Sequence, residues 1–343
     1  MGIIENDIKE LLLRLKKAGA SFEDKSVLIT GGAGFLGSWI CDILVRQNAK
    51  VTCLDTFYSG KMNNIEHLMN EENFKVVEYD ISQPVHLDEK FDIVMHLASR
   101  ASPLEFDKFP IQILKANTIG TWVALGIAKK NKARFLFAST SEVYGDAEVI
   151  PTPETYNGNV SPIGIRGCYD EAKRAGEAFV MAYHRQHKMD TRIARIFNTY
   201  GPRMRSDGYY GRVVPRFVYQ ALNNKPITVF GDGKQTRSFT YVVDEIEGLL
   251  KLAAYDGLAG EVINIGNNNE TTILELANLI IRLTGSNSEI EFYPLPEGDP
   301  RRRCPAIEKA KKLLNWEPRI DLEEGLKRII EWFDEYENDR NYS

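Results

Sequence analysis

A glycine-rich segment that directly follows a short apolar run is the feature that most constrains this chain. Residues 25–30 are rich in β-forming side chains, and the segment Gly31-Gly-Ala-Gly-Phe-Leu-Gly37 leads from them into a helical stretch. Such glycines permit a tight turn and a close backbone approach, so that the helix N-terminus can hold a pyrophosphate. A second strand is predicted over 50–55, and Asp55 at its end is placed to bond an adenosine ribose. The sequence therefore predicts a dinucleotide site.

The acid at the end of the second strand also bears on which dinucleotide binds. The carboxylate of Asp55 repels a 2′-phosphate and favours NAD over NADP, although the nearby Lys61 keeps NADP open. Asp80 and Ile81, at the end of the third strand, are expected to contact adenine. The alternative for Asp80 is a cap on the following loop.

Strand-like and helical segments alternate through the first part of the chain. Further strands are predicted at 74–79, 91–96, 134–139 and 191–197, and helices near 108–130 and 168–188. This alternation predicts an α/β fold, with a doubly wound parallel sheet.

The pattern changes after about residue 200, where Gly and Pro become denser. Short strands at 227–230, 261–265 and 289–292 alternate there with helices at 243–255, 271–284 and 321–338. We expect a smaller C-terminal α/β lobe that caps the carboxyl edge of the sheet and binds substrate. The predicted division is an N-terminal helix over 1–20, a cofactor domain over 21–200 and the second lobe over 201–343, with an interleaved boundary.

Composition excludes several classes of function. The chain has 43 Lys plus Arg against 48 Asp plus Glu, a net charge of −5, which argues against a nucleic-acid partner. Its four cysteines are scattered and no His cluster has ligand spacing, so neither a disulfide framework nor a metal site is predicted. No apolar run is long enough to span a membrane. We expect a soluble, cytoplasmic protein.

The first 20 residues form an amphipathic pattern ahead of the main fold, with apolar side chains at Ile4, Ile8, Leu11, Leu12 and Leu15. Packing on the body of the protein is the favoured interpretation. An oligomer contact and a membrane-surface contact remain open.

A tyrosine and a lysine four residues apart, Tyr169 and Lys173, share one face of a predicted helix. A tyrosine with a pKa of about 10 is a poor base at neutral pH, but a neighbouring ammonium and a cationic nicotinamide favour the phenolate. Such a tyrosine can remove a hydroxyl proton while hydride leaves the same carbon. The pair gains weight from the glycine segment and from a Ser-Thr-Ser-Glu run at 139–142, at a strand end.

These residues together resemble the extended short-chain dehydrogenase/reductase family, from about residue 24 to the C-terminus. That family has a modified Rossmann fold. Within it, the chain is most similar to the UDP-glucuronic acid decarboxylases. The similarity lies in blocks that follow in order: His96-Leu-Ala-Ser99, Ala101-Ser-Pro103, Leu114-Lys-Ala-Asn-Thr-Ile-Gly-Thr121, Ala138-Ser-Thr-Ser-Glu-Val-Tyr-Gly-Asp146, Cys168-Tyr-Asp-Glu171, Ala194-Arg-Ile-Phe-Asn-Thr199, Gly201-Pro-Arg-Met204, Gln235-Thr-Arg237 and Trp316-Glu-Pro318.

The resemblance implies roles for individual residues. Thr140 bonds the 4-hydroxyl of the sugar, Tyr169 is the base that starts oxidation, and Lys173 holds the nicotinamide ribose. Ser141, Glu142 and Arg237 take part in decarboxylation and reprotonation. The expected NAD contacts are Gly31, Gly34, Phe35, Leu36, Gly37, Asp55, Ser59, Gly60, Lys61, Asp80, Ile81, Leu97, Ser99, Ala138, Tyr169, Lys173 and Thr199. The expected contacts of a UDP-sugar are Lys115, Tyr183, Asn198, Arg212, Arg237 and Arg301.

The residue after Thr140 distinguishes a decarboxylase from related enzymes. In the 4,6-dehydratases that this region resembles, an Asp stands there and delivers a proton to the departing hydroxyl. This chain has Ser141. Expelling hydroxide needs a general acid, whereas a β-keto acid loses CO₂ with only an electron sink. The expected reaction is UDP-glucuronate to UDP-xylose plus CO₂ through a 4-ketone, with NAD regenerated.

Some positions depart from the decarboxylase pattern. Arg100 stands where that pattern has Pro, Ile165 and Gly167 flank Arg166 where Pro and Ala are usual, and an extra Gly-Tyr-Tyr stretch precedes Arg212. A nucleotide-sugar 4-epimerase or 4,6-dehydratase therefore remains the alternative. The run Arg301-Arg-Arg303 is either a phosphate contact or a solvated turn. The family resemblance also implies a homodimer through a four-helix contact of the helices near 108–130 and 168–188.

Overall fold

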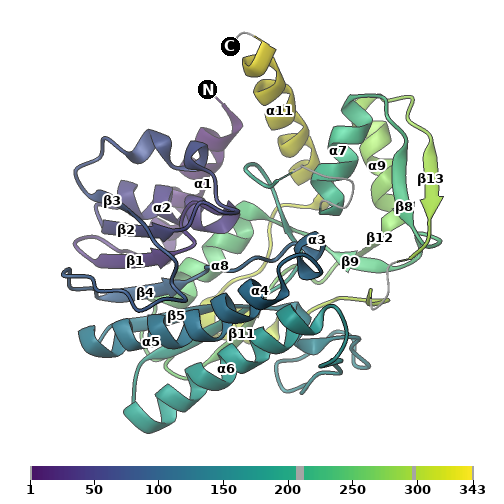
Figure 1. Cartoon of the computed structure of the whole chain (residues 1–343). Coiled ribbons are helices and arrows are strands. Elements are labelled where there is room, and N and C mark those ends of the chain that lie inside the picture. The colour runs from purple at the N-terminus through teal and green to yellow at the C-terminus, as the bar shows by residue number, and fades with distance from the viewer. Residues whose placement is uncertain (1, 206–211, 296–298, 342–343) are drawn as a thin grey trace.

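The computed structural model describes residues 2–205, 212–295 and 299–341, so the Gly-Tyr-Tyr stretch before Arg212 lies outside the described residues. One parallel sheet of seven strands runs in the order β11-β6-β5-β4-β1-β2-β3 (Figure 1). Its strands are β1 (Ser26–Thr30), β2 (Lys50–Asp55), β3 (Phe74–Glu78), β4 (Ile93–His96), β5 (Arg134–Thr140), β6 (Thr191–Ile196) and β11 (Val262–Ile265). This confirms the predicted doubly wound sheet. The strand order reverses between β1 and β4, and open sheets of this kind bind ligands beside that point.

Helices cover both faces of the sheet, which explains why its strands are apolar runs with no polar alternation. Val27, Leu28 and Ile29 of β1, for example, are fully buried. One face carries α4 (Pro110–Asn117), α5 (Ile119–Asn131) and α6 (Gly167–His187) (Figure 1). The other carries α2 (Phe35–Arg46), α8 (Val242–Ala254) and α10 (Glu308–Leu314).

The helix predicted over 108–130 is two helices, α4 and α5, that meet at Thr118. The Thr118 hydroxyl donates a hydrogen bond of 2.7 Å to the carbonyl of Leu114, one turn back. Such back-bonding bends helices. The periodicity of apolar residues continues through this break, so pattern alone does not reveal it.

Strand β11 corrects one expectation. The sequence assigned residues 261–265 to the smaller lobe, but β11 pairs in parallel with β6, from Val262 opposite Ile193 to Ile265 opposite Ile196. Helix α8 packs on β6 and carries the chain back to the sheet. Ile263 and Ile265 are fully buried there. The short apolar run finds this burial only in the large sheet.

The smaller lobe contains three two-stranded sheets and the helices packed on them. Its strand pairs are β7 (Thr199–Tyr200) with β10 (Thr240–Tyr241), β8 (Ile227–Phe230) with β13 (Ile290–Tyr293), and β9 (Thr236–Ser238) with β12 (Glu270–Thr272). Its helices are α7 (Val213–Leu222), α9 (Ile273–Thr284) and α11 (Leu322–Asn341). The chain also forms short helical segments, which are η1 (Met62–Asn64), η2 (Glu66–Leu68), α3 (Pro103–Phe106) and η3 (Ser141–Tyr144). One hydrophobic core runs from Trp39 of α2 to Phe217 of α7 and Leu276 of α9, so the lobes share buried side chains.

The N-terminal helix α1 (Ile3–Ala18) packs on α2, α8 and α11, which is the favoured one of the three interpretations. Leu11 and Leu15 are fully buried. Arg14 donates to the carboxylates of Asp244, at 2.6 Å, and Glu247, at 3.2 Å, both on α8. The helix is therefore part of the folded body. In the described part of the chain, no helix is long and apolar enough to cross a membrane.

Two leucines of α1 provide a matched test of this packing. Leu11 is fully buried and Leu13 is 60% exposed. Leu11→Ala is expected to lower the free energy of unfolding by about 2 to 5 kcal/mol, because it leaves a cavity between α1 and the body. Leu13→Ala is expected to change it by less than about 0.5 kcal/mol. Urea denaturation followed by circular dichroism measures both, and equal losses would contradict the packing of α1.

Candidate active site

The turn after β1 lies at the carboxyl edge of the sheet and holds the start of helix α2 close to the end of β1. Gly31 has a φ of +75°, and a Cβ there would lie 2.7 Å from the backbone nitrogen of Ala98. A Cβ on Gly37 would lie 2.1 Å from the carbonyl oxygen of Gly31. The N-cap of α2 is Gly34. The start of α2 thus has neither a capping side chain nor an acidic neighbour in its first turn, an arrangement that suits the binding of an anion.

Asp55, at the end of β2, lies beside this loop. Its carboxylate accepts 2.9 Å hydrogen bonds from the backbone N–H groups of Ala33 and Phe57. Burial raises the pKa of Asp55, and these hydrogen bonds work against that rise. A Cβ on Gly60 would lie 2.9 Å from the same carboxylate. The loop after β2 is therefore folded tightly around Asp55, where it can meet a ribose.

Other predicted cofactor residues lie at the same edge. Asp80 is exposed just after β3, and its carboxylate accepts from the N–H of Ser82 at 2.9 Å, so the cap interpretation describes its contact within the protein. The backbone N–H of Lys61 donates to the carbonyl of Ala33 at 3.1 Å. Among the remaining ones, Phe35 and Leu36 begin α2, Ala138 lies in β5 and Thr199 begins β7. The others lie in the loops after β2, β3 and β4: Ser59, Ile81, Leu97 and Ser99. A glycine cradle, a helix N-terminus and a carboxylate at the ribose position fit NAD.

The proton-transfer pair lies where α6 crosses the end of β5. The Lys173 ammonium donates to the carbonyl of Ala138 at 2.7 Å and lies 5.9 Å from the centre of the Tyr169 ring. The Tyr169 side chain is hydrogen-bonded to Thr140. Helix α6 approaches β5 closely because Gly176 faces Phe137, where a Cβ would lie 2.5 Å from the ring.

Burial shifts the pKa of both members of the pair. It lowers the pKa of Lys173 to about 7, although the charge of Glu177 acts in the opposite direction. It raises the pKa of Tyr169, against the cation of Arg212 and the hydrogen bond with Thr140. Burial thus acts against the lowering of the Tyr169 pKa that the sequence predicts.

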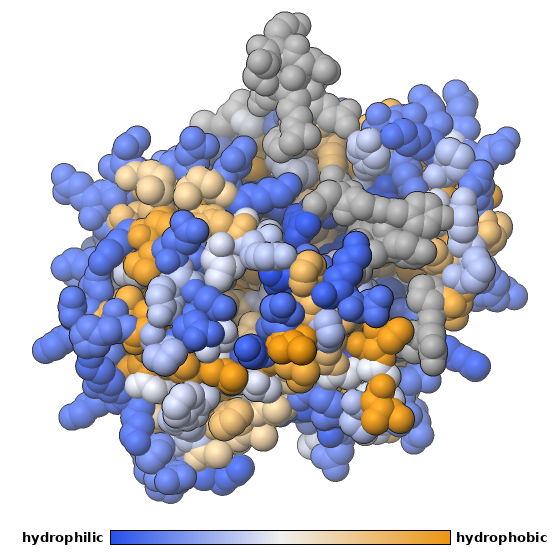
Figure 2. Space-filling view, viewed as in Figure 1, coloured by the Kyte–Doolittle hydropathy of each residue, from blue (hydrophilic) through white to orange (hydrophobic). Residues whose placement is uncertain are grey.

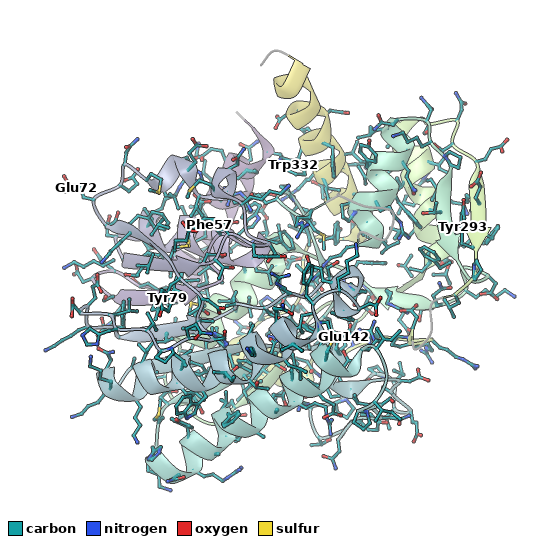
Figure 3. The ribbon with its side chains drawn as sticks, in the orientation of Figure 1. Phe57, Glu72, Tyr79, Glu142, Tyr293 and Trp332 are labelled. Carbon is teal, nitrogen blue, oxygen red and sulfur yellow. The ribbon has the colours of Figure 1, made fainter. Side chains whose placement is uncertain are left out.

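Glu142 lies between α6 and the smaller lobe (Figure 3). Its carboxylate is paired with two guanidinium groups. One belongs to Arg166, the residue just before α6, and the other to Arg303 of the smaller lobe. Asp170 faces Arg166 at 3.5 Å, and burial raises the pKa of Asp170 to about 6 despite the charge of Arg166. Two cations and two carboxylates thus balance in a mostly buried cluster.

Arg237, predicted to act with Glu142, contacts a different acid. Its guanidinium donates to Asp299 at 2.9 Å and to the carbonyl of Thr236 at 2.8 Å. The arginines that touch Glu142 are Arg166 and Arg303, and the sequence marked Arg303 only as part of a basic run. The run of three arginines indicated a basic contact, but the sequence does not show which of the three side chains is buried. Arg303 is 6% exposed, whereas Arg301 and Arg302 are exposed.

The remaining predicted substrate residues come from several different elements and loops. Arg212 adds positive charge beside Tyr169, and Asn198 follows β6 with its carbonyl bonded to the N–H of Thr240 at 2.9 Å. Lys115 and Arg301 are exposed. Ser141 is 3% exposed at the start of η3.

Tyr183 is a correction. It lies on α6, 14 residues past Tyr169, which is about 21 Å along a helix. There it lines a surface groove with Trp122 and the loop at 84–87. The helix carries Tyr183 away from the site, and we do not propose it as a substrate residue.

Two residues that sequence reasoning missed support the catalytic groups. Phe106 of α3 stacks on Tyr169, with ring centres 5.3 Å apart and an angle of 17° between the rings. Glu177, one turn past Lys173, accepts from Ser139 at 2.6 Å and is paired with Arg195 at 2.7 Å. Neither forms a recognisable motif, because their partners are distant in sequence.

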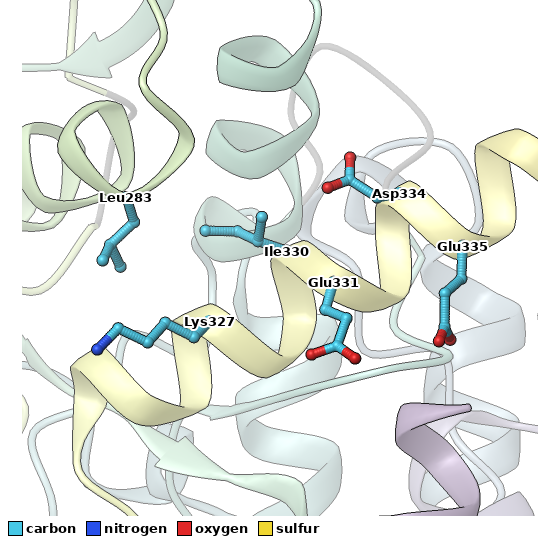
Figure 4. Close-up of a pocket in the computed structure, with 6 residues that line it drawn as sticks. All are labelled: Leu283, Lys327, Ile330, Glu331, Asp334 and Glu335. Atoms are coloured by element: carbon cyan, nitrogen blue, oxygen red, sulfur yellow. The ribbon is translucent and has the colours of Figure 1, made fainter. Parts of the chain in front are cut away.

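A separate hollow lies between α9 and α11 (Figure 4). Its lining includes three acidic side chains, Glu331, Asp334 and Glu335, against one basic side chain, Lys327. It is not formed by the carboxyl ends of the sheet strands, and its charge disfavours an anionic ligand. The predicted site residues therefore define the candidate active site.

Comparison with known proteins supports this assignment. Residues 27–266 match the model of the NAD dependent epimerase/dehydratase family. UDP-glucuronic acid decarboxylase 1 of Danio rerio is 48% identical over 309 residues, which cover 90% of this chain and 72% of that protein. An epimerase of Methanothermobacter thermautotrophicus superposes with a TM-score of 0.86 at 31% identity, over 95% of this chain and 97% of the other. A UDP-glucuronic acid 4-epimerase of Bacillus cereus, solved with UDP-glucuronic acid and NAD, gives 0.80 at 29% identity, over 91% and 99%.

The contact of Gly37 with the turn after β1 predicts the effect of one added methyl group. Gly37→Ala is expected to weaken NAD binding by about 10-fold or more, because the new Cβ must push α2 away from Gly31. Gly126→Ala is the matched control, since nothing lies within 4 Å of a Cβ at that position in α5. Calorimetric titration of each variant with NAD measures the effect. Equal affinities for the two variants would contradict the assignment of the cradle.

Proposed function

Because this chain belongs to the NAD-dependent epimerase/dehydratase family, we propose that it is a carboxy-lyase that converts UDP-glucuronate to UDP-xylose and CO₂. Relatives 45–48% identical over 90% of the chain are named UDP-glucuronic acid decarboxylases. The structural observation that carries the proposal is the Glu142 cluster beside Thr140 and Tyr169. The glycine turn, the N-terminus of α2 and Asp55 would hold a tightly bound NAD, which would supply reversible hydride transfer at C4 of the sugar.

The hydroxyl groups of Tyr169 and Thr140 bind the 4-hydroxyl of the sugar and transfer its proton. Thr140 orients the 4-hydroxyl of the sugar and Tyr169 removes its proton, since the two side chains already bond each other. Lys173 lies at the same strand end and helps to stabilise the phenolate. Phe106 covers the ring of Tyr169 and limits the access of water. The product of this step is the 4-ketone of the uronate.

The 4-ketone of a uronate is a β-keto acid, and the bond from C5 to the carboxylate breaks without a general acid. Its electron pair enters the C4 carbonyl, where the hydroxyl groups of Thr140 and Tyr169 stabilise the enolate. A proton must then reach C5. This proton comes from solvent, and we assign its delivery to Glu142 with its partners Arg166 and Arg303. Ser141 provides no acid for expelling hydroxide.

The positive side chains around the cleft suit the diphosphate of UDP. We assign Arg212, Arg237 and Arg301 to this role, with Asn198 and Lys115 at the edges of the cleft. Guanidinium groups bind phosphate in a bidentate geometry, which supports the assignment.

A nucleotide-sugar 4-epimerase is the second candidate, because the chain superposes on a UDP-glucuronic acid 4-epimerase with a TM-score of 0.80. An epimerase shares the oxidation at C4 but returns hydride to the other face of the ketone and keeps the carboxylate. Product mass therefore separates the two candidates.

We predict that the purified protein converts UDP-glucuronate to a product lighter by one CO₂, identified by mass and by comigration with UDP-xylose. Tyr169→Phe is expected to lower the rate of CO₂ release by about 100-fold or more, because the base for the 4-hydroxyl is lost. Tyr183→Phe, on the same helix but away from the site, is expected to retain the wild-type rate.

An isomer of unchanged mass would identify the epimerase instead. A Tyr169→Phe variant that releases CO₂ at the wild-type rate would overturn the assigned base. Ultraviolet absorbance of reduced nicotinamide in single-turnover experiments shows whether the loss occurs at the oxidation step.

We propose a cytoplasmic location as well. All four cysteines are free thiols in the structure, the form that a reducing compartment maintains.

We also propose that two copies form a homodimer through a four-helix contact of α5 and α6. Apolar side chains are exposed on these helices and on α4, and Figure 2 shows such residues in orange over this part of the molecule. They include Ile119 (42% exposed) and Trp122 (52%) on α5, and Phe179 (38%) on α6. Large exposed apolar side chains that gather on neighbouring helices support an association site.

Trp122→Glu is expected to shift the protein from dimer to monomer, because it buries a charge in the proposed contact. Phe292→Glu is the control, since Phe292 is similarly exposed, at 57%, but lies on β13 of the smaller lobe. Size-exclusion chromatography with light scattering gives the masses. A wild-type monomer, or a Trp122→Glu dimer, would contradict this contact.

A further inference from the structure

Arg100 occupies an unusual position after strand β4. Its guanidinium carbon lies 3.2 Å from the centre of the Tyr58 ring and 4.6 Å from that of Phe109. These two rings meet edge to face, 5.5 Å apart. The guanidinium is therefore held in one plane by aromatic contacts on two sides.

One end of this guanidinium lacks a partner in the described part of the chain. The Nη1 atom of Arg100 is buried and makes no hydrogen bond there. A buried guanidinium nitrogen without an acceptor is costly. An oxygen-rich anion bound next to this guanidinium would supply the missing acceptor.

The two loops that meet at Arg100 flank the glycine cradle. On one side, the backbone at Ala98 packs against Gly31. A Cβ added to Gly31 would lie only 2.7 Å from the backbone nitrogen of Ala98. On the other side, Tyr58 follows Asp55, which is bonded to Ala33 in the cradle at 2.9 Å. The stack of Arg100 on Tyr58 thus joins the loop after β2 to the loop after β4, across the turn where a pyrophosphate would lie.

We propose that Arg100 is a cofactor-retaining residue of this chain. Its guanidinium closes the loops over bound NAD and donates to a phosphate oxygen from the atom that has no partner within the protein. The inference rests on the proposed tight binding of NAD, not on the sugar chemistry. The decarboxylase pattern has proline at this position, so the contact would be an addition in this chain.

The helix N-terminus and Arg100 act on different sides of the phosphates. The N–H groups at the start of α2 bear partial positive charge on one side, and the guanidinium adds a full charge with planar donors on the other. Stacking on Tyr58 fixes the donors beforehand, so little rotational freedom is lost on binding. The expected consequence is slow release of NAD.

The test compares three ligands on the full-length chain after removal of bound nucleotide. Calorimetric titration uses NAD, ADP and adenosine, with the wild type, Arg100→Met, Arg100→Lys and a control, Arg282→Met. The Arg282 side chain is 66% exposed and pairs with Glu323, away from the cleft. The rate of NAD release is measured by exchange with labelled NAD.

Arg100→Met is expected to weaken NAD and ADP by about 10- to 100-fold, because a charge-assisted contact to phosphate is lost. Adenosine, which has no phosphate, is expected to bind within about twofold of the wild type. Arg100→Lys keeps the charge but not the planar stack, and its affinity is expected to lie between the two. Arg282→Met is expected to match the wild type.

Unchanged affinity for NAD and ADP in Arg100→Met overturns the proposal. An equal loss for adenosine also overturns it, because Arg100 would then only support the loops. A wild-type chain that does not bind NAD overturns this inference together with the proposed cofactor. A wild-type chain that binds NAD but leaves UDP-glucuronate intact overturns only the proposed reaction, and the comparison of Arg100 variants still decides this proposal. Thermal melting of each variant without nucleotide separates loss of fold from loss of binding.

Discussion

The close approach of helix α2 to the turn after β1 sets the geometry around which the site is built. A methyl group at Gly37 would reach within 2.1 Å of the Gly31 carbonyl oxygen, and one at Gly31 would meet the backbone at Ala98. No side chain separates the helix N-terminus from the loops after β2 and β4. Asp55 therefore reaches the cradle through the Ala33 N–H, and these loops meet directly over it. Parallel pairing places the ends of β5 and β6 at the same edge, which brings the catalytic groups to the cradle.

Charge balance joins the two lobes at this edge. Glu142 comes from the end of β5, Arg166 from the start of α6 and Arg303 from the smaller lobe, and their side chains are mostly buried together. Removing one member of a buried ionic group costs about 3 to 5 kcal/mol, because the other charge is left without a partner. The cluster therefore positions the lobes relative to each other and holds Glu142 at the end of β5.

Local sequence patterns predicted most of the elements correctly. The strand at 50–55 and the helix near 168–188 correspond to β2 and α6, because strand propensity, glycine turns and apolar periodicity act over a few residues. The patterns failed where neighbours distant in sequence decide the outcome. Strand β11 looks like any short strand, and only its pairing with β6 places it in the large sheet. The break at Thr118 depends on one side-chain hydrogen bond that periodicity does not record.

The sequence by itself determined the doubly wound fold, the glycine cradle with Asp55, and the grouping of Thr140, Tyr169 and Lys173. Each of these depends on short spacings along one turn, one helix or one strand end. Tertiary structure alone decided that Arg303 joins Arg166 at Glu142, that Arg237 meets Asp299, and that Tyr183 lies far from the site. A basic run or a matched motif fixes which charges a chain has. Which charge is buried, and against which partner, depends on how the two lobes pack.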